Sequence, residues 1–112
     1  MIYHKHSLTE IRQRPFVAGA CVWNLNDFYS ESRGDAVPHV NNKGLAGLDR
    51  ELKDAYLYYQ ASLSTQPMLQ IGNREWKWRA GMAEAGQTQC LQTVPVYTNA
   101  SRVELIVNGK SI

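Results

Sequence analysis

The side chains with the clearest binding chemistry lie in two short segments, 23–24 and 41–43. Asn41 and Lys43 offer an amide donor and an ammonium group two residues apart, a pair suited to holding a carboxylate or hydroxyl groups. Trp23 ends an apolar run, directly before Asn24, and its indole ring can form an apolar platform. An Asn followed by Lys-Gly is also common turn chemistry, so the residues at 41–44 have a structural explanation as well.

The acidic residues do not form a catalytic pattern. Asp27 is better suited to orienting its loop by accepting backbone hydrogen bonds. We assign no catalytic residue within the chain, because helix caps and solvated charges are the ordinary explanation for the other acidic residues, namely Glu10, Glu31, Asp35, Asp49 and Glu51.

Neither the cysteines nor the histidines indicate a metal or a cofactor. Cys21 and Cys90 are too few for a disulfide framework or a metal site. We expect Cys21, which lies in an apolar run, to be a buried and unpaired thiol. The three histidines, His4, His6 and His39, have no ligand spacing and are expected at the surface. The sequence therefore predicts no metal and no cofactor.

Charge and hydropathy argue against two classes of partner. Twelve Lys and Arg residues against ten Asp and Glu residues leave a net charge of +2, and no basic run exceeds two residues. This pattern does not favour a nucleic acid or a membrane surface as partner. The longest largely apolar stretch, Phe16 to Trp23, is far shorter than the roughly 20 residues that a membrane span needs.

The beginning of the chain has the pattern of an α/β unit. Ser7 and Glu10 are spaced as a capping box, which predicts a short helix from Leu8 to Arg14, closed by Pro15. Residues 16–23 are apolar at every position, as expected for a strand covered on both faces in a parallel sheet.

A long polar loop and a second helix follow this predicted strand. Residues 24–47 are rich in Asn, Ser and Gly, and a loop of this length favours a function. Apolar residues at helical spacing predict a helix from Arg50 to Leu63, with Asp49 as its N-cap. The predicted strand has no neighbour to pair with in this half, so we expect the chain to be part of a larger fold.

After residue 64 the apolar period changes from helical spacing to two. Asn108-Gly109 is a strong type I′ hairpin signal, and we expect this hairpin to be cut off before its second strand can form. Half-buried antiparallel strands are predicted where apolar residues alternate with other residues, at Leu69 and Ile71, at Val94 and Val96, and at Val103, Leu105 and Val107.

Motifs in three regions of the chain, in the same order, resemble those of the family 2 glycoside hydrolases. Trp23-Asn24-Leu25-Asn26-Asp27-Phe28 is similar to the segment that ends the eighth barrel strand in that family. The family's Asn-x-Lys-Gly, Asp-Arg and Lys-Asp-Ala-aromatic patterns resemble Asn41 to Gly44, Asp49-Arg50 and Lys53 to Tyr56. Val96 to Ala100 and Val103 to Ser111 resemble the immunoglobulin-like domain that follows the barrel.

The resemblance implies a fold class that combines α/β with all-β structure. Residues 1–64 would form the last strand and helix of a TIM (β/α)8 barrel, and residues 65–112 the start of an immunoglobulin-like β-sandwich. It also implies a non-proline cis peptide between Trp23 and Asn24. Trp76 and Trp78 would share one face of a strand, where covering the domain junction is a commoner use than binding glycans.

The function implied by the resemblance is part of a retaining β-glycosidase, with β-galactosidase ahead of β-glucuronidase. Both catalytic carboxylates would lie upstream of Met1, so we expect the chain alone to be inactive. The carbohydrate substrate would contact four side chains, those of Trp23, Asn24, Asn41 and Lys43, although Trp23 could also cap the barrel interior. A non-catalytic carbohydrate-binding or structural module is the alternative.

Overall fold

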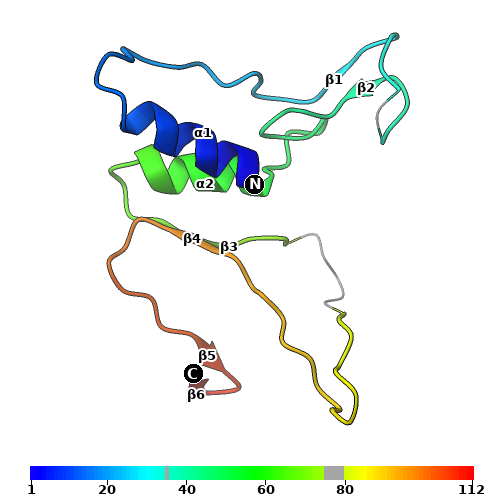
Figure 1. The fold of residues 1–112 in the computed structure, drawn as a ribbon, viewed down its shortest axis with the longest axis vertical. Coiled ribbons are helices and arrows are strands. Elements are labelled where there is room, and N and C mark those ends of the chain that lie inside the picture. The colour runs from blue at the N-terminus through cyan, green and yellow to red at the C-terminus, as the bar shows by residue number, and fades with distance from the viewer. Residues whose placement is uncertain (35, 75–79) are drawn as a thin grey trace. The chain divides into compact units, whose positions relative to one another are not determined.

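The computed structural model describes residues 1–34, 36–74 and 80–112. Two compact units, Met1–Leu57 and Tyr58–Ile112, make up the chain, and Figure 1 labels their helices and strands. The two helices in this described part of the chain lack the length and apolar character needed to cross a membrane. Trp76, Trp78 and Asp35, on which the sequence made predictions, lie outside the described residues.

Helix α1 extends from Ile2 to Arg12, so the predicted start at Leu8 is wrong. Residues 2–6 contain no glycine or proline, and the helix therefore continues back through them. Ser7 lies inside the helix instead of capping it, and Met1 occupies the N-cap position. The predicted end is close to the observed one, because the helix stops three residues before Pro15.

Residues 16–23 form no strand, contrary to the prediction. A strand needs a neighbour for its backbone groups, and the described residues pair no segment with this one. Its apolar side chains are consequently uncovered, with Phe16 81% and Val22 38% exposed. Cys21 is unpaired as predicted, but it is exposed and not buried.

Strands β1 (Phe28–Tyr29) and β2 (Val40–Asn41) form an antiparallel pair within the loop predicted over 24–47. Phe28 lies opposite Asn41, and Tyr29 lies opposite Val40. Both β2 residues are buried, whereas both β1 residues are exposed. Part of the long loop is thus ordered by its own backbone hydrogen bonds.

A second backbone ladder joins the segment before β1 to the segment after β2. The amide of Asp27 donates to the carbonyl of Ala46 at 2.8 Å, and the amide of Ala46 donates to the carbonyl of Leu25 at 2.8 Å. The amide of Leu45 donates to the carbonyl of Asn24 at 3.0 Å. Leu45 and Ala46 are buried at this ladder, which holds residues 24–27 beside residues 44–46.

Helix α2 runs from Asp54 to Leu63, so its predicted end is confirmed and its predicted start at Arg50 is wrong. Arg50 has a positive φ of 67°, a left-handed conformation that a helix cannot contain. The amide of Gly47 donates to the carbonyl of Glu51 at 2.9 Å, closing a turn before the helix. Asp49 lies in this turn and does not cap α2.

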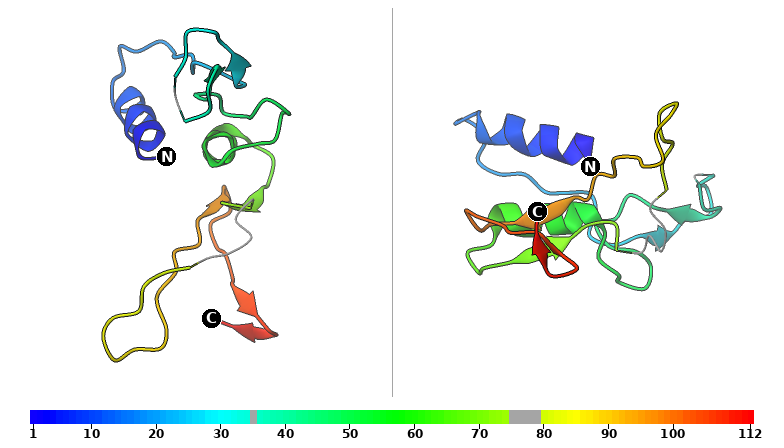
Figure 2. Two further views of the ribbon diagram at one scale, coloured as in Figure 1. Left: turned by 90° about the vertical axis from the view of Figure 1, so that its right-hand side faces the viewer. Right: turned by 90° about the horizontal axis from the view of Figure 1, so that it is seen from below.

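In the second unit, β3 (Leu69–Ile71) pairs antiparallel with β4 (Val96–Thr98). The predicted strands are confirmed at Leu69 to Ile71 and at Val96, but Val94, Val103 and Leu105 lie outside the observed strands because no described segment pairs with them. Leu69 and Ile71 remain 50% and 45% exposed, and Tyr97, opposite Gln70, is the buried residue of the pair. Alternation defines two faces without deciding which one is covered. The described residues 80–95 between these strands form no helix or strand and are drawn mainly in yellow in Figure 2.

A small hairpin ends the described chain. Strands β5 (Ile106–Val107) and β6 (Lys110–Ser111) pair across Asn108 and Gly109, whose φ angles of 52° and 79° are both positive. The predicted type I′ signal is consistent with this geometry. The expectation that no second strand would form is wrong, because a two-residue turn places the next two residues directly opposite β5.

The side chain of Asn99, directly after β4, forms hydrogen bonds to the turn that precedes β3. Its Oδ1 accepts a hydrogen bond from the amide of Met68 at 2.9 Å. Its Nδ2 donates to the carbonyls of Ser64 at 3.1 Å and Gln66 at 2.7 Å. One amide group therefore satisfies three backbone groups of the turn that leads into β3.

We predict that Asn99→Ala lowers the free energy of unfolding by about 1–2 kcal/mol, because three hydrogen bonds are lost at an exposed site. Asn99→Asp keeps the acceptor for Met68 and loses only the donors. Amide exchange at Met68 should therefore accelerate in the alanine variant more than in the aspartate variant. Gln66→Ala is the control, since it removes an exposed side chain and leaves the accepting carbonyl; equal exchange in all variants would contradict the prediction.

Gly44 permits the close approach of the ladder between residues 24–27 and 44–46. A Cβ at this position would lie 2.6 Å from the carbonyl oxygen of Ala46 and closer still to backbone atoms of Asn26 and Asp27. Backbone atoms cannot rotate away as a side chain can. Glycine is therefore required here by space.

We predict that Gly44→Ala destabilises the protein by roughly 1–3 kcal/mol, because the added methyl group forces the ladder apart. Gly19→Ala is the matched control, since a Cβ at Gly19 would meet no atom within 4 Å. Thermal unfolding of the two variants measures the difference. Equal melting temperatures would show that the ladder has room for the added methyl group.

Candidate functional site

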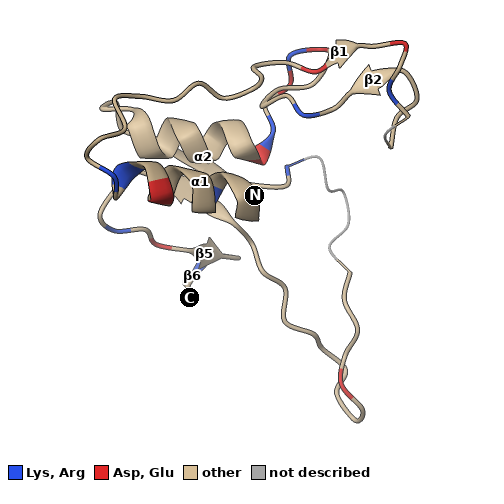
Figure 3. Ribbon diagram, turned by 45° about the horizontal axis from the view of Figure 1, so that its top comes forward, with Lys and Arg blue, Asp and Glu red and all other residues tan. Residues whose placement is uncertain are grey.

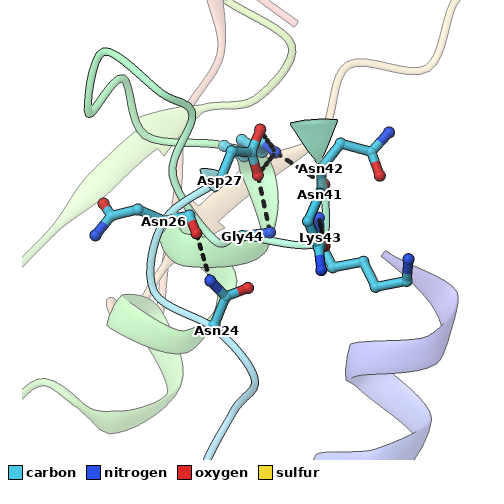
Figure 4. Close-up of polar contacts among 8 residues, drawn as sticks. Asn24, Asn26, Asp27, Asn41, Asn42, Lys43 and Gly44 are labelled. Atoms are coloured by element: carbon cyan, nitrogen blue, oxygen red, sulfur yellow. Dashed lines mark hydrogen bonds and ion pairs between the residues drawn. The ribbon is translucent and has the colours of Figure 1, made fainter. Parts of the chain in front are cut away.

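The carboxylate of Asp27 is the centre of the polar network drawn in Figure 4. Lys53 Nζ donates to Asp27 Oδ1 and to Asp27 Oδ2, each at 2.7 Å. The amide of Gly44 donates to Asp27 Oδ1 at 2.9 Å. This confirms the prediction that Asp27 orients its loop by accepting a backbone hydrogen bond.

The ammonium of Lys53 makes one further contact in this network, a hydrogen bond to the carbonyl of Asn42 at 3.1 Å. The side chain of Asp27 is 10% exposed and that of Lys53 is 35% exposed, so this ion pair is less screened by solvent than a pair at an open surface. Sequence reasoning missed Lys53 as a site residue. The only sequence feature that pointed to Lys53 was its place in the Lys-Asp-Ala-aromatic pattern.

Lys53 is itself fixed by the start of α2. Its amide donates to the carbonyl of Leu45 at 3.0 Å, and its carbonyl accepts the amides of Tyr56 at 2.9 Å and Leu57 at 3.3 Å. Leu57 is 2% exposed, which anchors this first helical turn. The helix therefore determines where the Lys53 side chain begins.

The side chain of Asn41 closes a turn with Lys43. Asn41 is 4% exposed, and its Oδ1 accepts a hydrogen bond from the amide of Lys43 at 3.3 Å. This contact determines the orientation of the Asn41 amide group, because only the oxygen can accept. The Asn41 Nδ2 has no hydrogen-bond partner within the described ranges, and it remains available as a donor.

Lys43 is exposed, and its side chain points away from the Asp27 carboxylate in Figure 4. Its ammonium therefore lies outside the Asp27 and Lys53 ion pair. The loop presents this cation next to the turn that orients Asn41.

The peptide bond between Trp23 and Asn24 is cis, as the family resemblance implied. Asn24 Nδ2 donates to the carbonyl of Asn26. Asn24 Oδ1 is buried and has no hydrogen-bond partner in the part of the chain that the structure describes. Trp23 is 75% exposed, so it does not cap a core in this unit.

The structure thus brings three of the four predicted site residues, Asn24, Asn41 and Lys43, to one loop region. The backbone ladder joins Asn24 to the segment directly after Asn41 and Lys43, and Trp23 precedes Asn24 in the chain. Among the described residues, no group of three or more His, Cys, Asp or Glu side chains could hold a metal. Acidic and basic residues are interspersed along the described chain in Figure 3.

Two curated relatives match nearly the whole chain, although no protein-family model matches it. The β-glucuronidase of Bacteroides fragilis is 38% identical over 113 residues, covering 97% of this chain. The β-galactosidase BoGH2A of Bacteroides ovatus is 30% identical over 109 residues, covering 96% of this chain. The chain spans 15% of the length of the first relative and 12% of the length of the second.

Solved structures agree with these sequence relatives. A β-glucuronidase of Bacteroides uniformis superposes with a TM-score of 0.87 and 40% identity, over 98% of this chain and 13% of that protein. A β-glucuronidase of Parabacteroides merdae superposes with a TM-score of 0.81 and 33% identity, over 97% and 13% of the two chains. Sequence and structure together show that this chain belongs to the family 2 glycoside hydrolases, of whose proteins it matches one segment.

Proposed function

We propose that this chain is part of a retaining β-glycosidase and supplies part of its sugar-binding subsite. The similarity to two named glycosidases over at least 96% of the chain supports this proposal. In this arrangement residues 1–64 belong to the end of a (β/α)8 barrel, and residues 65–112 begin an immunoglobulin-like domain. The antiparallel strands β3 to β6, all after residue 64, are consistent with that division.

The chain contributes no catalytic carboxylate in this proposal. Asp27 is the carboxylate nearest to the candidate subsite residues in the network, and both of its oxygens accept hydrogen bonds from Lys53. Asp27 Oδ1 also accepts the amide of Gly44, so both oxygens of this carboxylate are already used in holding the loop. The acid/base and nucleophile of a retaining enzyme would therefore come from other segments.

The sugar we propose is a β-glucuronide. The sequence placed β-galactosidase first, but relatives named β-glucuronidase are 38% and 40% identical to this chain, whereas the relative named β-galactosidase is 30% identical. A β-galactoside is the second candidate because of that last relative. The degree of similarity favours the acidic sugar.

The orientation of Asn41 is the observation that carries this choice. Asn41 Oδ1 already accepts a hydrogen bond from the amide of Lys43, so Asn41 can offer a ligand only its donor Nδ2. Lys43, an exposed residue two positions later, adds an ammonium group. Two donors without an acceptor suit a carboxylate better than a hydroxyl group, which both donates and accepts.

Trp23 and Asn24 complete the proposed subsite. The exposed indole of Trp23 offers an apolar face to a pyranose ring. Asn24 Oδ1 has acceptor capacity that a hydroxyl donor can fill. The subsite then combines a platform, an acceptor and two donors for the acidic group.

We predict that the full-length protein from the continuous reading frame hydrolyses p-nitrophenyl β-D-glucuronide. Lys43→Met and Asn41→Leu should each lower kcat/KM for this substrate by about 10-fold to 100-fold, since each removes a hydrogen bond to a charged group. Lys110→Met, at an exposed lysine of β6, is the matched control. Residues 1–112 alone should show no hydrolysis.

Three results would count against this function. Hydrolysis of the galactoside with no hydrolysis of the glucuronide would favour the second candidate sugar. Sugar binding by residues 1–112 within a short reading frame and without hydrolysis would favour a non-catalytic module. Unchanged kinetics in both site variants would remove Asn41 and Lys43 from the subsite.

A further inference from the structure

We propose that Asp27 and Lys53 are positioning residues that determine specificity for an acidic sugar by holding the Asn41 to Lys43 turn. This inference rests on the proposed function, and it assigns a role to two residues that do not touch the ligand. Its basis is the hydrogen-bond network on the two sides of Lys43.

The ion pair holds the backbone immediately before and immediately after Lys43. Lys53 Nζ donates to the carbonyl of Asn42 at 3.1 Å, and Asp27 Oδ1 accepts from the amide of Gly44 at 2.9 Å. The two anchors are joined by the Asp27 and Lys53 contacts of 2.7 Å. One charged pair therefore holds the chain on both sides of Lys43.

The same pair is tied to the rest of the unit by backbone contacts. Asp27 belongs to the ladder through its amide, which donates to the carbonyl of Ala46 at 2.8 Å. The first turn of α2 holds Lys53 through its amide and carbonyl. The Asn41 to Lys43 turn is thus connected to both the ladder and α2, and a shift of Asp27 or Lys53 would move Lys43.

Position matters most for a ligand group that needs both donors. A carboxylate that bonds to Asn41 Nδ2 and to the Lys43 ammonium requires a defined distance between them, because charge-assisted hydrogen bonds weaken steeply with poor geometry. An uncharged hydroxymethyl group at the same sugar position gains little from that geometry. Loss of the pair should therefore affect an acidic sugar selectively.

The test compares two substrates that differ at this sugar position, p-nitrophenyl β-D-glucuronide and p-nitrophenyl β-D-glucoside, with the full-length protein. Asp27→Asn keeps an oxygen for Gly44 and removes the charge, and Lys53→Met removes the ammonium at similar length. Each variant should lower kcat/KM for the glucuronide roughly tenfold, mainly through KM, and change the glucoside less than about twofold. Lys110→Met is the control.

Two further variants separate positioning from general stability. The double variant Asp27→Asn with Lys53→Met should lose no more glucuronide activity than the stronger single variant, because the two residues act as one pair. Lys53→Arg keeps the positive charge and should restore part of the selectivity. If Lys53→Met does not fold, Asp27→Asn and Lys53→Arg provide the same comparison.

The outcomes distinguish this inference from the proposed function. An equal loss on both substrates with a lower melting temperature would mean that the pair is only structural, and unchanged selectivity would also overturn the inference; both leave the proposed function intact. A parent protein that does not hydrolyse the glucuronide would overturn the proposed function, and this inference with it.

Discussion

The contact between the Asp27 carboxylate and the Lys53 ammonium organises the first unit. It joins two residues 26 positions apart and converts a long polar loop into a defined turn. Neither partner is deeply buried, but the pair is sheltered enough to hold two backbone groups that flank Lys43. Glycine at position 44 makes the arrangement possible, because any side chain there would meet the backbone of Asn26 and Asp27.

The Asn41 turn reconciles two interpretations that the sequence left open. A loop Asn before Lys-Gly can serve as a turn residue or as a ligand-binding residue. In the structure Asn41 Oδ1 closes the turn, which leaves Nδ2 as the group directed to any ligand. The turn contact is therefore compatible with the sugar contact that we propose for Asn41.

Uncovered apolar surface marks the boundary of what this chain orders by itself. Residues 16–23 have the composition of a buried strand, yet Phe16 is 81% exposed and no described segment pairs with them. Leu69 and Ile71 alternate as in a half-buried strand but also remain exposed. An apolar pattern shows that a segment can be buried, but burial requires a second layer of structure to pack against.

The sequence by itself determined the local features. The Asn108-Gly109 turn, the end of α2, the strand at Leu69 to Ile71 and the structural use of Asp27 follow from side-chain chemistry within a few residues. The family motifs further implied the cis peptide at Trp23 and Asn24. Only the tertiary structure decided that Lys53 reaches Asp27 and which face of the β3 and β4 pair is covered. These depend on contacts between residues far apart in the chain, which local pattern does not contain.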